Sequence, residues 1–317
     1  KARMSLDRPM LGIALMLGFC LLAPLADGIA KAIGPAVPLW QVVAVRFVAQ
    51  AALLTPLVWA TGRTLRMPAR RLPAIVLRTL FHVAGVALMF LSLRYLPLAD
   101  AIAIAYVMPF VVLLLGWLAM GEQVGWRRLT ASVAGFGGTL LVMQPSFEQV
   151  GLVVLLPLGV ALCFALFMLL TRHVAREIGA VELQAVNGLI GAALLLPALV
   201  FAEGSGLPEL DPVMPEARAL WLLAALAVTG TLAHLLLTWS LRFAPASTVA
   251  PMQYVEIPVA AALGWAMFAE LPAPRAALGI AVVMAAGLYV IWREQALARQ
   301  AAAPPSAGRP ATPPPPA

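Results

Sequence analysis

Long apolar runs separated by short charged or Pro/Gly-rich breaks dominate the sequence. A helix of about 20 apolar residues spans the roughly 30 Å hydrocarbon core of a bilayer, because each residue adds about 1.5 Å. The pattern therefore predicts an all-α integral membrane protein of ten transmembrane helices, with neighbours antiparallel because the connections are short. The expected spans are residues 10–33, 36–60, 73–93, 98–119, 127–143, 151–170, 181–202, 218–241, 245–268 and 275–292.

One segment occurs twice in the chain. Residues 92–127 align with residues 240–275 at a constant offset, without a gap. The ends of the first and sixth spans also correspond, as IAKAIG (29–34) and VAREIG (174–179). These matches predict two repeats of five helices each. The identities include scarce residue types that chance matching of Leu- and Ala-rich sequence would not return: Arg94/Arg242, Pro97/Pro245, Tyr106/Tyr254, Trp117/Trp265, Glu122/Glu270 and Arg127/Arg275.

Five is an odd number, so the second repeat enters the membrane from the opposite side and the two repeats are inverted. Transporters use inverted repeats to build two exchangeable access states, with the substrate near the bilayer midplane between the repeats. We expect a cytoplasmic N-terminus (1–9), a first repeat (10–143), a second repeat (151–292) and a disordered Pro/Ala-rich cytoplasmic tail (293–317). The first apolar run is expected to remain as a span rather than to be cleaved as a signal peptide.

The composition and the charge distribution agree with this prediction. Hydrophobic residues make up 62% of the chain and charged residues only 11%, which excludes a water-soluble fold. The net charge of +7 does not indicate a nucleic-acid partner, because the basic residues lie in short loops between apolar runs. Of the 21 Lys and Arg residues, 15 fall on the side of the termini, four on the other side and two within spans. The positive-inside rule therefore predicts that both termini are cytoplasmic.

Motifs for catalysis and for cofactor or metal binding are missing from the sequence. It contains no Walker loop, HExxH, GxSxG, CxxC or GxGxxG. We therefore expect no enzymatic activity, no cofactor and no metal. The rival functional class is an intramembrane lipid-modifying enzyme, which needs a catalytic pair at one depth. His82, His234 and Glu256 are the residues that could supply such a pair.

Polar side chains at membrane depth identify the candidate site, since an ionised group there costs about 2.5–3.5 kcal/mol to insert. Arg46 in the second span and Asp27 in the first form a predicted pair, which acts as a structural clasp or as a gate. His82 lies on a polar face of the third span, and His234 lies on a similar face of the eighth, beside Trp239. Each histidine binds substrate, moves a proton or is simply hydrogen-bonded inside the bundle.

The ninth span carries a second group of candidate residues. Gln253 and Glu256 share a face, and Tyr254 between them is the repeat equivalent of Tyr106. Glu256 attracts an ammonium group, takes up a transported proton or stays neutral and hydrogen-bonded. Aromatic walls with a few polar groups suit a flat, amphipathic ligand. Prolines inside spans predict kinks that act as hinges or only as packing features, and those in the fourth and ninth spans are Pro109 and Pro258.

These repeated residues resemble a known family. The motifs are Ala105–Pro109 with Gly116-Trp117 and Gly121-Glu122, and later Pro251–Pro258 with Gly264-Trp265 and Glu270. They resemble the paired EamA domains of the drug/metabolite transporter superfamily. The resemblance implies ten helices, cytoplasmic termini and movement of a small metabolite across the bacterial inner membrane without ATP hydrolysis. In the first repeat Ala105 and Met108 replace Gln253 and Glu256, so the site is expected to be asymmetric in polarity.

The resemblance also suggests a cargo. The chain also looks similar in pattern to aromatic amino-acid exporters of this superfamily, which implies a small-molecule substrate such as an aromatic or large apolar amino acid. The alternative within the superfamily is a transporter of riboflavin or S-adenosylmethionine. We expect membrane lipid around a monomer. The predicted substrate-binding residues are His82, Tyr106, His234, Trp239, Gln253, Tyr254 and Glu256.

Overall fold

The computed structural model describes residues 8–108, 110, 111, 126–175, 177–244, 249 and 252–302 of the chain. These residues form helices and connecting segments, and none of them forms a strand. The all-α class predicted from the apolar pattern is confirmed for this part of the chain. Its α-helices are α1 (Pro9–Ile33), α2 (Leu39–Ala60), α3 (Leu72–Leu93), α4 (Leu98–Ala105), α6 (Trp126–Val150), α7 (Leu156–Val174), α8 (Ala180–Ala202), α9 (Ala217–Phe243), α11 (Glu256–Phe268) and α12 (Pro274–Ala302).

Six segments within the described ranges are long and apolar enough to cross a membrane. They are Met10–Ala36, Leu39–Ala60, Ala69–Leu93, Val133–Thr171, Ala180–Ala202 and Ala217–Phe243. The segment Val133–Thr171 contains parts of both α6 and α7, which the sequence pattern predicts as two spans. The predicted fourth and ninth spans are represented among the described residues by shorter helices, α4 and α11, because turns at Tyr106–Val107 and at Tyr254–Val255 interrupt them.

Several helix boundaries differ from those predicted. A 3-10 helix (Gly151–Leu155) precedes α7, because Gly151 adopts a positive φ of 65° that ends α6 and redirects the chain. Helix α6 extends to Val150, past the predicted end at 143. Helix α12 extends to Ala302, into the segment predicted to be disordered. Residues 293–302 are mostly Ala, Arg, Gln, Glu and Leu, which favour helix, and the first proline of the tail comes only at 304.

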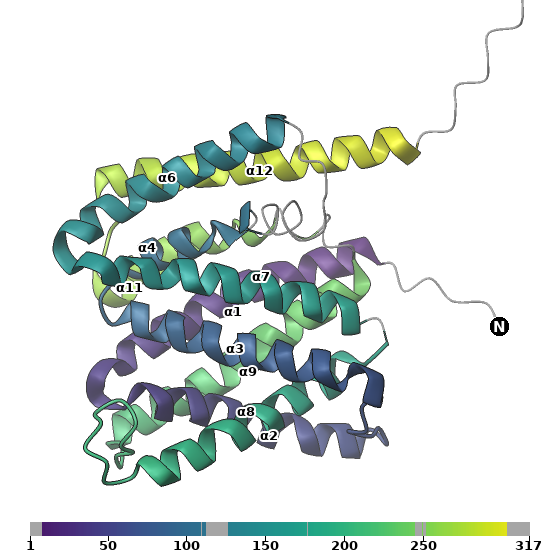
Figure 1. Ribbon diagram of the computed structural model, residues 1–317, viewed down its shortest axis with the longest axis vertical. Helices are drawn as coiled ribbons and strands as arrows, with labels where there is room; N and C mark the ends of the chain where they lie inside the picture. Colours follow the sequence, from purple (N-terminus) through teal and green to yellow (C-terminus); the bar gives the residue numbers. More distant parts are fainter. Residues whose placement is uncertain are drawn as a thin grey trace, which may run out of the picture.

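The helices pack in pairs that join the first half of the chain to the second. The most extensive pairs are α1 with α9, α6 with α12, α2 with α8 and α3 with α7, and α11 packs against both α1 and α4. Figure 1 shows α6 and α12 together at one end of the molecule and α2 and α8 together at the other. The remaining helices lie between these two outer pairs (Figure 1). The centre of the molecule is therefore built from both halves of the chain.

Glycines allow the outer pairs to approach closely. A Cβ added at Gly188 of α8 would lie 2.6 Å from the main-chain nitrogen of Ala51 and 3.0 Å from the carbonyl oxygen of Phe47, both in α2. A Cβ at Gly279 of α12 would lie 2.5 Å from the carbonyl oxygen of Gly138 in α6. Small residues are common at helix interfaces in membranes because they let two backbones meet.

Ion pairs connect the helices at each end of the bundle. At the end where α1 meets α11 and α4, Lys31 Nζ lies 2.7 Å from Glu270 Oε1 and donates to the carbonyl oxygen of Leu96 at 2.6 Å. At the other end, Glu177 in the α7–α8 connection pairs with Arg71 and Arg70. The hydrogen bonds from Arg71 lower the pKa of the Glu177 carboxyl to about 2. Both sets of contacts tie the first half of the chain to the second.

Candidate functional site

A cavity of about 100 Å³ lies between the halves of the chain. Side chains from α1, α2, α3, α4, α7, α9 and α11 line it, together with residues just after α4. Its walls are mostly apolar, and its aromatic members include Phe19, Phe81, Phe90 and Phe164. The polar members are few: Asp27, Arg46, His82, Tyr106, His234 and Glu256. All six were singled out from the sequence.

The two histidines form one side of the cavity. The rings of His82 and His234 stack with centroids 4.3 Å apart and planes at 28°. Arg46 lies against both rings, with Nη2 2.9 Å from His234 Nδ1 and Nη1 3.5 Å from His82 Nε2. Arg46 is only 3% exposed and His82 only 2%. A guanidinium and two imidazoles therefore share a small volume that is almost closed to bulk solvent.

The predicted pairing of Arg46 with Asp27 is not a direct contact. The ion pairs found within 4.0 Å among the described residues do not join these two side chains. Instead, the histidine rings occupy the positions next to the guanidinium. Both Asp27 and Arg46 nevertheless face the same cavity, so their charges act on whatever enters it. A role for the pair as a gate stays a prediction.

A chain of hydrogen bonds supports His82 from the side away from the cavity. Arg78, fully buried in α3, donates from Nε to Thr171 Oγ1 at 2.7 Å and from Nη1 to Asn187 Oδ1 at 2.9 Å. The amide nitrogen of Asn187 lies 2.9 Å from His82 Nδ1. The Arg78 guanidinium also lies over the Phe167 ring, 4.4 Å from its centroid. This network fixes the ring of His82 relative to α7 and α8.

Two amide side chains on one face of α8, Asn187 and Gln184, were not predicted from the sequence. Gln184 accepts from Gln50 Nε2 at 3.0 Å and donates to Thr238 Oγ1 at 2.7 Å, which links α2, α8 and α9. Both residues are completely buried. Two amide side chains three residues apart in an otherwise apolar span are a signal that would have found them.

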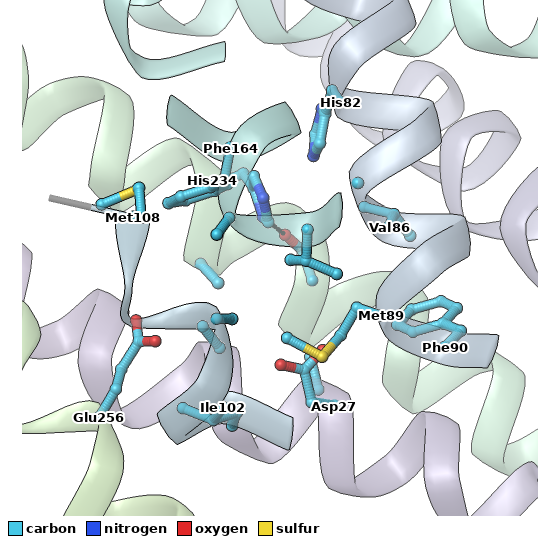
Figure 2. Close-up of a pocket in the computed structure, with 18 of the residues that line it drawn as sticks. Asp27, His82, Val86, Met89, Phe90, Ile102, Met108, Phe164, His234 and Glu256 are labelled. Atoms are coloured by element: carbon cyan, nitrogen blue, oxygen red, sulfur yellow. Dashed lines mark hydrogen bonds between the residues drawn. The ribbon is translucent and has the colours of Figure 1, made fainter. Parts of the chain in front are cut away.

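Carboxyl groups form the other side of the cavity. Figure 2 shows Asp27 and Glu256 on the side opposite the two imidazole rings. Glu256 and Tyr106 both line the cavity, and Glu256 Oε1 has no hydrogen-bond partner among the described residues. Glu256 is 7% exposed. A buried carboxyl oxygen without a partner is costly, so it favours a cation, a proton or a hydrogen-bond donor in the cavity.

Three predicted residues lie outside the cavity. Trp239 is half-buried and packs with an apolar cluster of α2, α8 and α9 residues. Tyr254 is 2% exposed, and its ring lies 5.4 Å from that of Tyr106. Its hydroxyl points at α12, where a Cβ on Gly287 would lie 1.7 Å from it. Gln253 is 3% exposed and does not line the cavity.

The two predicted hinges have different outcomes. Pro258 lies in the first turn of α11, where a helix has unpaired N–H groups in any case, so it removes no internal hydrogen bond there. The break in the helix precedes it, at the turn formed by Tyr254 and Val255. Pro109 lies outside the described residues. Movement at either position remains a prediction.

The arrangement has the features of a binding site. The polar groups lie around the cavity in two sets, the guanidinium with the two imidazoles on one side and the two carboxyls on the other. Cation-attracting groups and hydrogen-bond donors face each other across apolar and aromatic walls. Such a cavity can orient an amphipathic molecule that carries polar atoms at two ends.

The sequence model of the EamA-like transporter family matches residues 10–144 and again residues 151–293. A protein of known crystal structure superimposes with a TM-score of 0.61 at 20% sequence identity, over 93% of this chain and 99% of that one. At this identity the superposition shows a shared fold.

Named relatives are transporters. A riboflavin transporter of Rhizobium johnstonii is 31% identical over 74% of this chain and 74% of its own length. A riboflavin transporter of Vibrio cholerae is 27% identical over 68% of this chain and 70% of its own length. An S-adenosylmethionine uptake transporter of Rickettsia bellii is 23% identical over 85% of this chain and 89% of its own length.

Proposed function

Because the chain belongs to the EamA-like transporter family, and is therefore a multi-pass membrane transporter and not an enzyme, we propose that it moves a flat heterocyclic metabolite by alternating access. The candidate cargoes are riboflavin and S-adenosylmethionine. The observation that carries the proposal is the cavity, which lies between the halves of the chain and has aromatic walls and two opposed sets of polar groups. Transport requires a binding site of this kind that faces each side of the membrane in turn.

Alternating access needs two halves that exchange roles, and the packing supports inverted repeats. The equivalents of α1 and α3 in the second repeat are α7 and α9. Exchange of the two repeats therefore turns the pair of α1 and α9 into the pair of α7 and α3. The pairs α2 with α8 and α6 with α12 map onto themselves. These four pairs make the most extensive helix contacts among the described residues. A two-fold axis in the membrane plane, relating ten spans, accounts for this pattern.

Individual contacts support the same relation. Arg46 and Asn187 occupy equivalent positions, each seven residues after the start of α2 and α8. Asn187 contacts His82, whose repeat equivalent at the offset of 148 is Gly230. Arg46 lies against Gly230, where a Cβ would be 2.8 Å from its Nε. Equivalent residues therefore meet in both halves, while their chemistry differs.

The comparisons favour riboflavin or S-adenosylmethionine over the amino-acid exporter first expected from the sequence. The relatives include riboflavin transporters and S-adenosylmethionine uptake transporters. Both molecules combine a flat ring system with polar groups, which suits aromatic walls flanked by donors and carboxyl groups. The cavity of about 100 Å³ is smaller than the roughly 300–1,000 Å³ of most ligand sites, so binding requires helices to move apart.

Counterflow in proteoliposomes tests the cargo. Vesicles loaded with unlabelled riboflavin, S-adenosylmethionine, phenylalanine or leucine are diluted into a trace of the labelled compound, and its uptake is followed. We expect accumulation for riboflavin or S-adenosylmethionine. Accumulation restricted to the amino acids would overturn the cargo proposal and support amino-acid transport. Chemical alteration of lipid without translocation would support the enzyme class instead.

A matched pair of tyrosine variants tests the site. Tyr106→Phe removes a hydroxyl from the wall of the cavity, so we expect a lower cargo affinity. Tyr254→Phe removes the equivalent hydroxyl of the other repeat, which has no partner among the described residues, so we expect wild-type affinity. Equal effects of the two substitutions on the counterflow KM would contradict the assignment of the cavity as the binding site.

Orientation is proposed from the distribution of basic residues. Both termini lie in the cytoplasm of a bacterial cell, and the protein resides in the inner membrane as a monomer. Cysteines introduced at each end of the chain should react with a membrane-impermeant thiol reagent only after the membrane is opened. Labelling of one end in intact spheroplasts would contradict the inverted arrangement of five and five helices.

A further inference from the structure

We propose that His82 Nε2–H and Arg46 Nη1 together form a subsite for a hydrogen-bond acceptor of the cargo, and that Asn187 is the positioning residue for it. The acceptor is a carbonyl or carboxylate oxygen. The identity of the ligand rests on the proposed transport function, whereas the position of the proton on His82 is a property of the protein alone.

The orientation of the Asn187 amide is determined by Arg78. A guanidinium has only donors, so the atom of Asn187 that lies 2.9 Å from Arg78 Nη1 must be the carbonyl oxygen Oδ1. The nitrogen Nδ2 then faces His82 Nδ1 at 2.9 Å. Arg78 is itself held by its donation to Thr171 Oγ1 at 2.7 Å. If the amide were reversed, the NH2 group of Asn187 would face the Arg78 guanidinium, and both groups are donors.

The amide orientation in turn determines the tautomer of His82. Because Asn187 Nδ2 donates, His82 Nδ1 must accept and carries no hydrogen. A neutral imidazole has one N–H, which is then on Nε2. A doubly protonated ring would direct Nδ1–H at the Asn187 NH2 group. The Nε2–H donor is therefore the group that His82 presents to the cavity (Figure 2).

Two donors consequently converge without an acceptor. Arg46 Nη1 and His82 Nε2 lie 3.5 Å apart, and both carry hydrogen, so this contact is not a hydrogen bond between them. No carboxylate of the described residues lies within 4.0 Å of Arg46. Both side chains are at least 97% buried, which limits satisfaction by bulk water. An oxygen entering between these nitrogens would accept from both.

The two candidate cargoes offer such an oxygen in different forms. Riboflavin carries uncharged ring carbonyls, and S-adenosylmethionine carries a carboxylate. Asp27 and Glu256 on the opposite side of the cavity would meet the polyol of the first or the cationic groups of the second. The shared requirement is an acceptor oxygen at one end of the molecule, and loss of that oxygen is the discriminating change.

The first experiment measures the proton directly, in the full-length protein in lipid nanodiscs with 15N-labelled histidine. The chain has only three histidines, and His173→Gln together with His234→Gln assigns their signals. We expect an unprotonated Nδ1 and a protonated Nε2 for His82. In Asn187→Asp the new carboxylate accepts from the ring, so the proton moves to Nδ1. A protonated His82 Nδ1 in the wild-type protein would overturn the proposal, whatever the cargo is.

The second experiment measures binding of riboflavin and of S-adenosylmethionine. His82→Phe keeps an aromatic ring against His234 and removes the donor, so affinity should fall about tenfold. His82→Gln restores an N–H and should recover part of it, while Asn187→Asp should resemble His82→Phe. Tyr254→Phe serves as the control with unchanged affinity. Unchanged affinity in His82→Phe would overturn the subsite.

The ligands separate the two acceptor sources. Decarboxylated S-adenosylmethionine keeps the sulfonium and the amine, so a loss of its affinity relative to the parent compound assigns the subsite to a carboxylate. Tight riboflavin binding that depends on His82 assigns it to a carbonyl. If the wild-type protein binds neither compound, the proposed cargo is wrong, and the histidine spectrum still decides whether the donor pair exists.

Discussion

Substitution of Gly188 by alanine introduces a methyl group where α8 lies directly against the main chain of α2. The new Cβ would lie 2.6 Å from the Ala51 nitrogen and 3.0 Å from the Phe47 carbonyl oxygen. Ordinary contact begins at 3.4 Å, so the nearer atom is about 0.8 Å too close. Both atoms belong to the main chain of α2, and no side-chain rotation can relieve the clash. The two helices must therefore move apart.

Overpacking of this kind costs about 1–3 kcal/mol. For a domain of roughly this size each kcal/mol lowers the melting temperature by about 2–4 °C, so we expect a decrease of about 2–12 °C. The displacement also affects the cavity, because Arg46 precedes Phe47 and Asn187 precedes Gly188. Binding sites need their groups held within about 0.5 Å, so cargo affinity should fall severalfold together with stability.

Thermal unfolding followed by the intrinsic fluorescence of the eight tryptophans measures the stability, and counterflow measures the transport. Gly137→Ala is the matched control, because Gly137 also lies inside a long helix and a Cβ there meets no atom within 4 Å. We expect the control to retain or slightly increase the melting temperature. Equal melting temperatures for the two variants would refute the close approach of α2 and α8.

Three further predictions concern charged groups. Glu256→Gln removes an exchangeable proton from the cavity, so exchange should persist while its dependence on pH disappears; a pH profile identical to wild type would contradict a coupling role. Lys31 and Glu270 should show a coupling free energy of about 0.5–1 kcal/mol in a double-mutant cycle of unfolding. The double variant K31E/E270K should recover stability that E270K alone loses. Additive effects of the two substitutions would show that the ion pair contributes nothing to stability. The pKa of Glu177 is lowered to about 2 by Arg71, so its contribution is complete above the unfolded value of 4.5 and is lost as pH falls towards 2. The melting-temperature advantage of wild type over Glu177→Gln should therefore vanish across that range, and an advantage that is independent of pH would exclude this ion pair as its source.

The apolar pattern alone was sufficient for the class of fold and for most helix positions. The predicted spans 10–33, 73–93 and 181–202 differ by no more than one residue at either end from α1, α3 and α8. This accuracy has a physical reason, since the bilayer sets the length of a span and excludes unpaired backbone groups. The same rule fails at two places. Near Tyr254 the helix breaks although the sequence is apolar, and beyond residue 292 residues that favour helix continue past the end of the apolar run.

The site was predicted in part for a similar reason. A polar residue in an apolar run must face the protein interior, which identified Asp27, Arg46, His82, His234 and Glu256. All five line the cavity. The sequence could not specify whether a polar residue faces the cavity or a contact between two helices, and the two equivalent tyrosines show this. Tyr106 lines the cavity, whereas Tyr254 directs its hydroxyl at α12.

Residue types and helical period give the polar stripe of each helix, because they depend only on the local chain. The partners of each stripe depend on how helices rotate and approach when they pack. Asn187 of α8 meets His82 of α3, the adjacent Gly188 lies against the main chain of α2, and Arg46 meets two histidines instead of Asp27. The sequence by itself determined a membrane protein with ionisable groups inside it, and only the tertiary structure decided which of those groups touch.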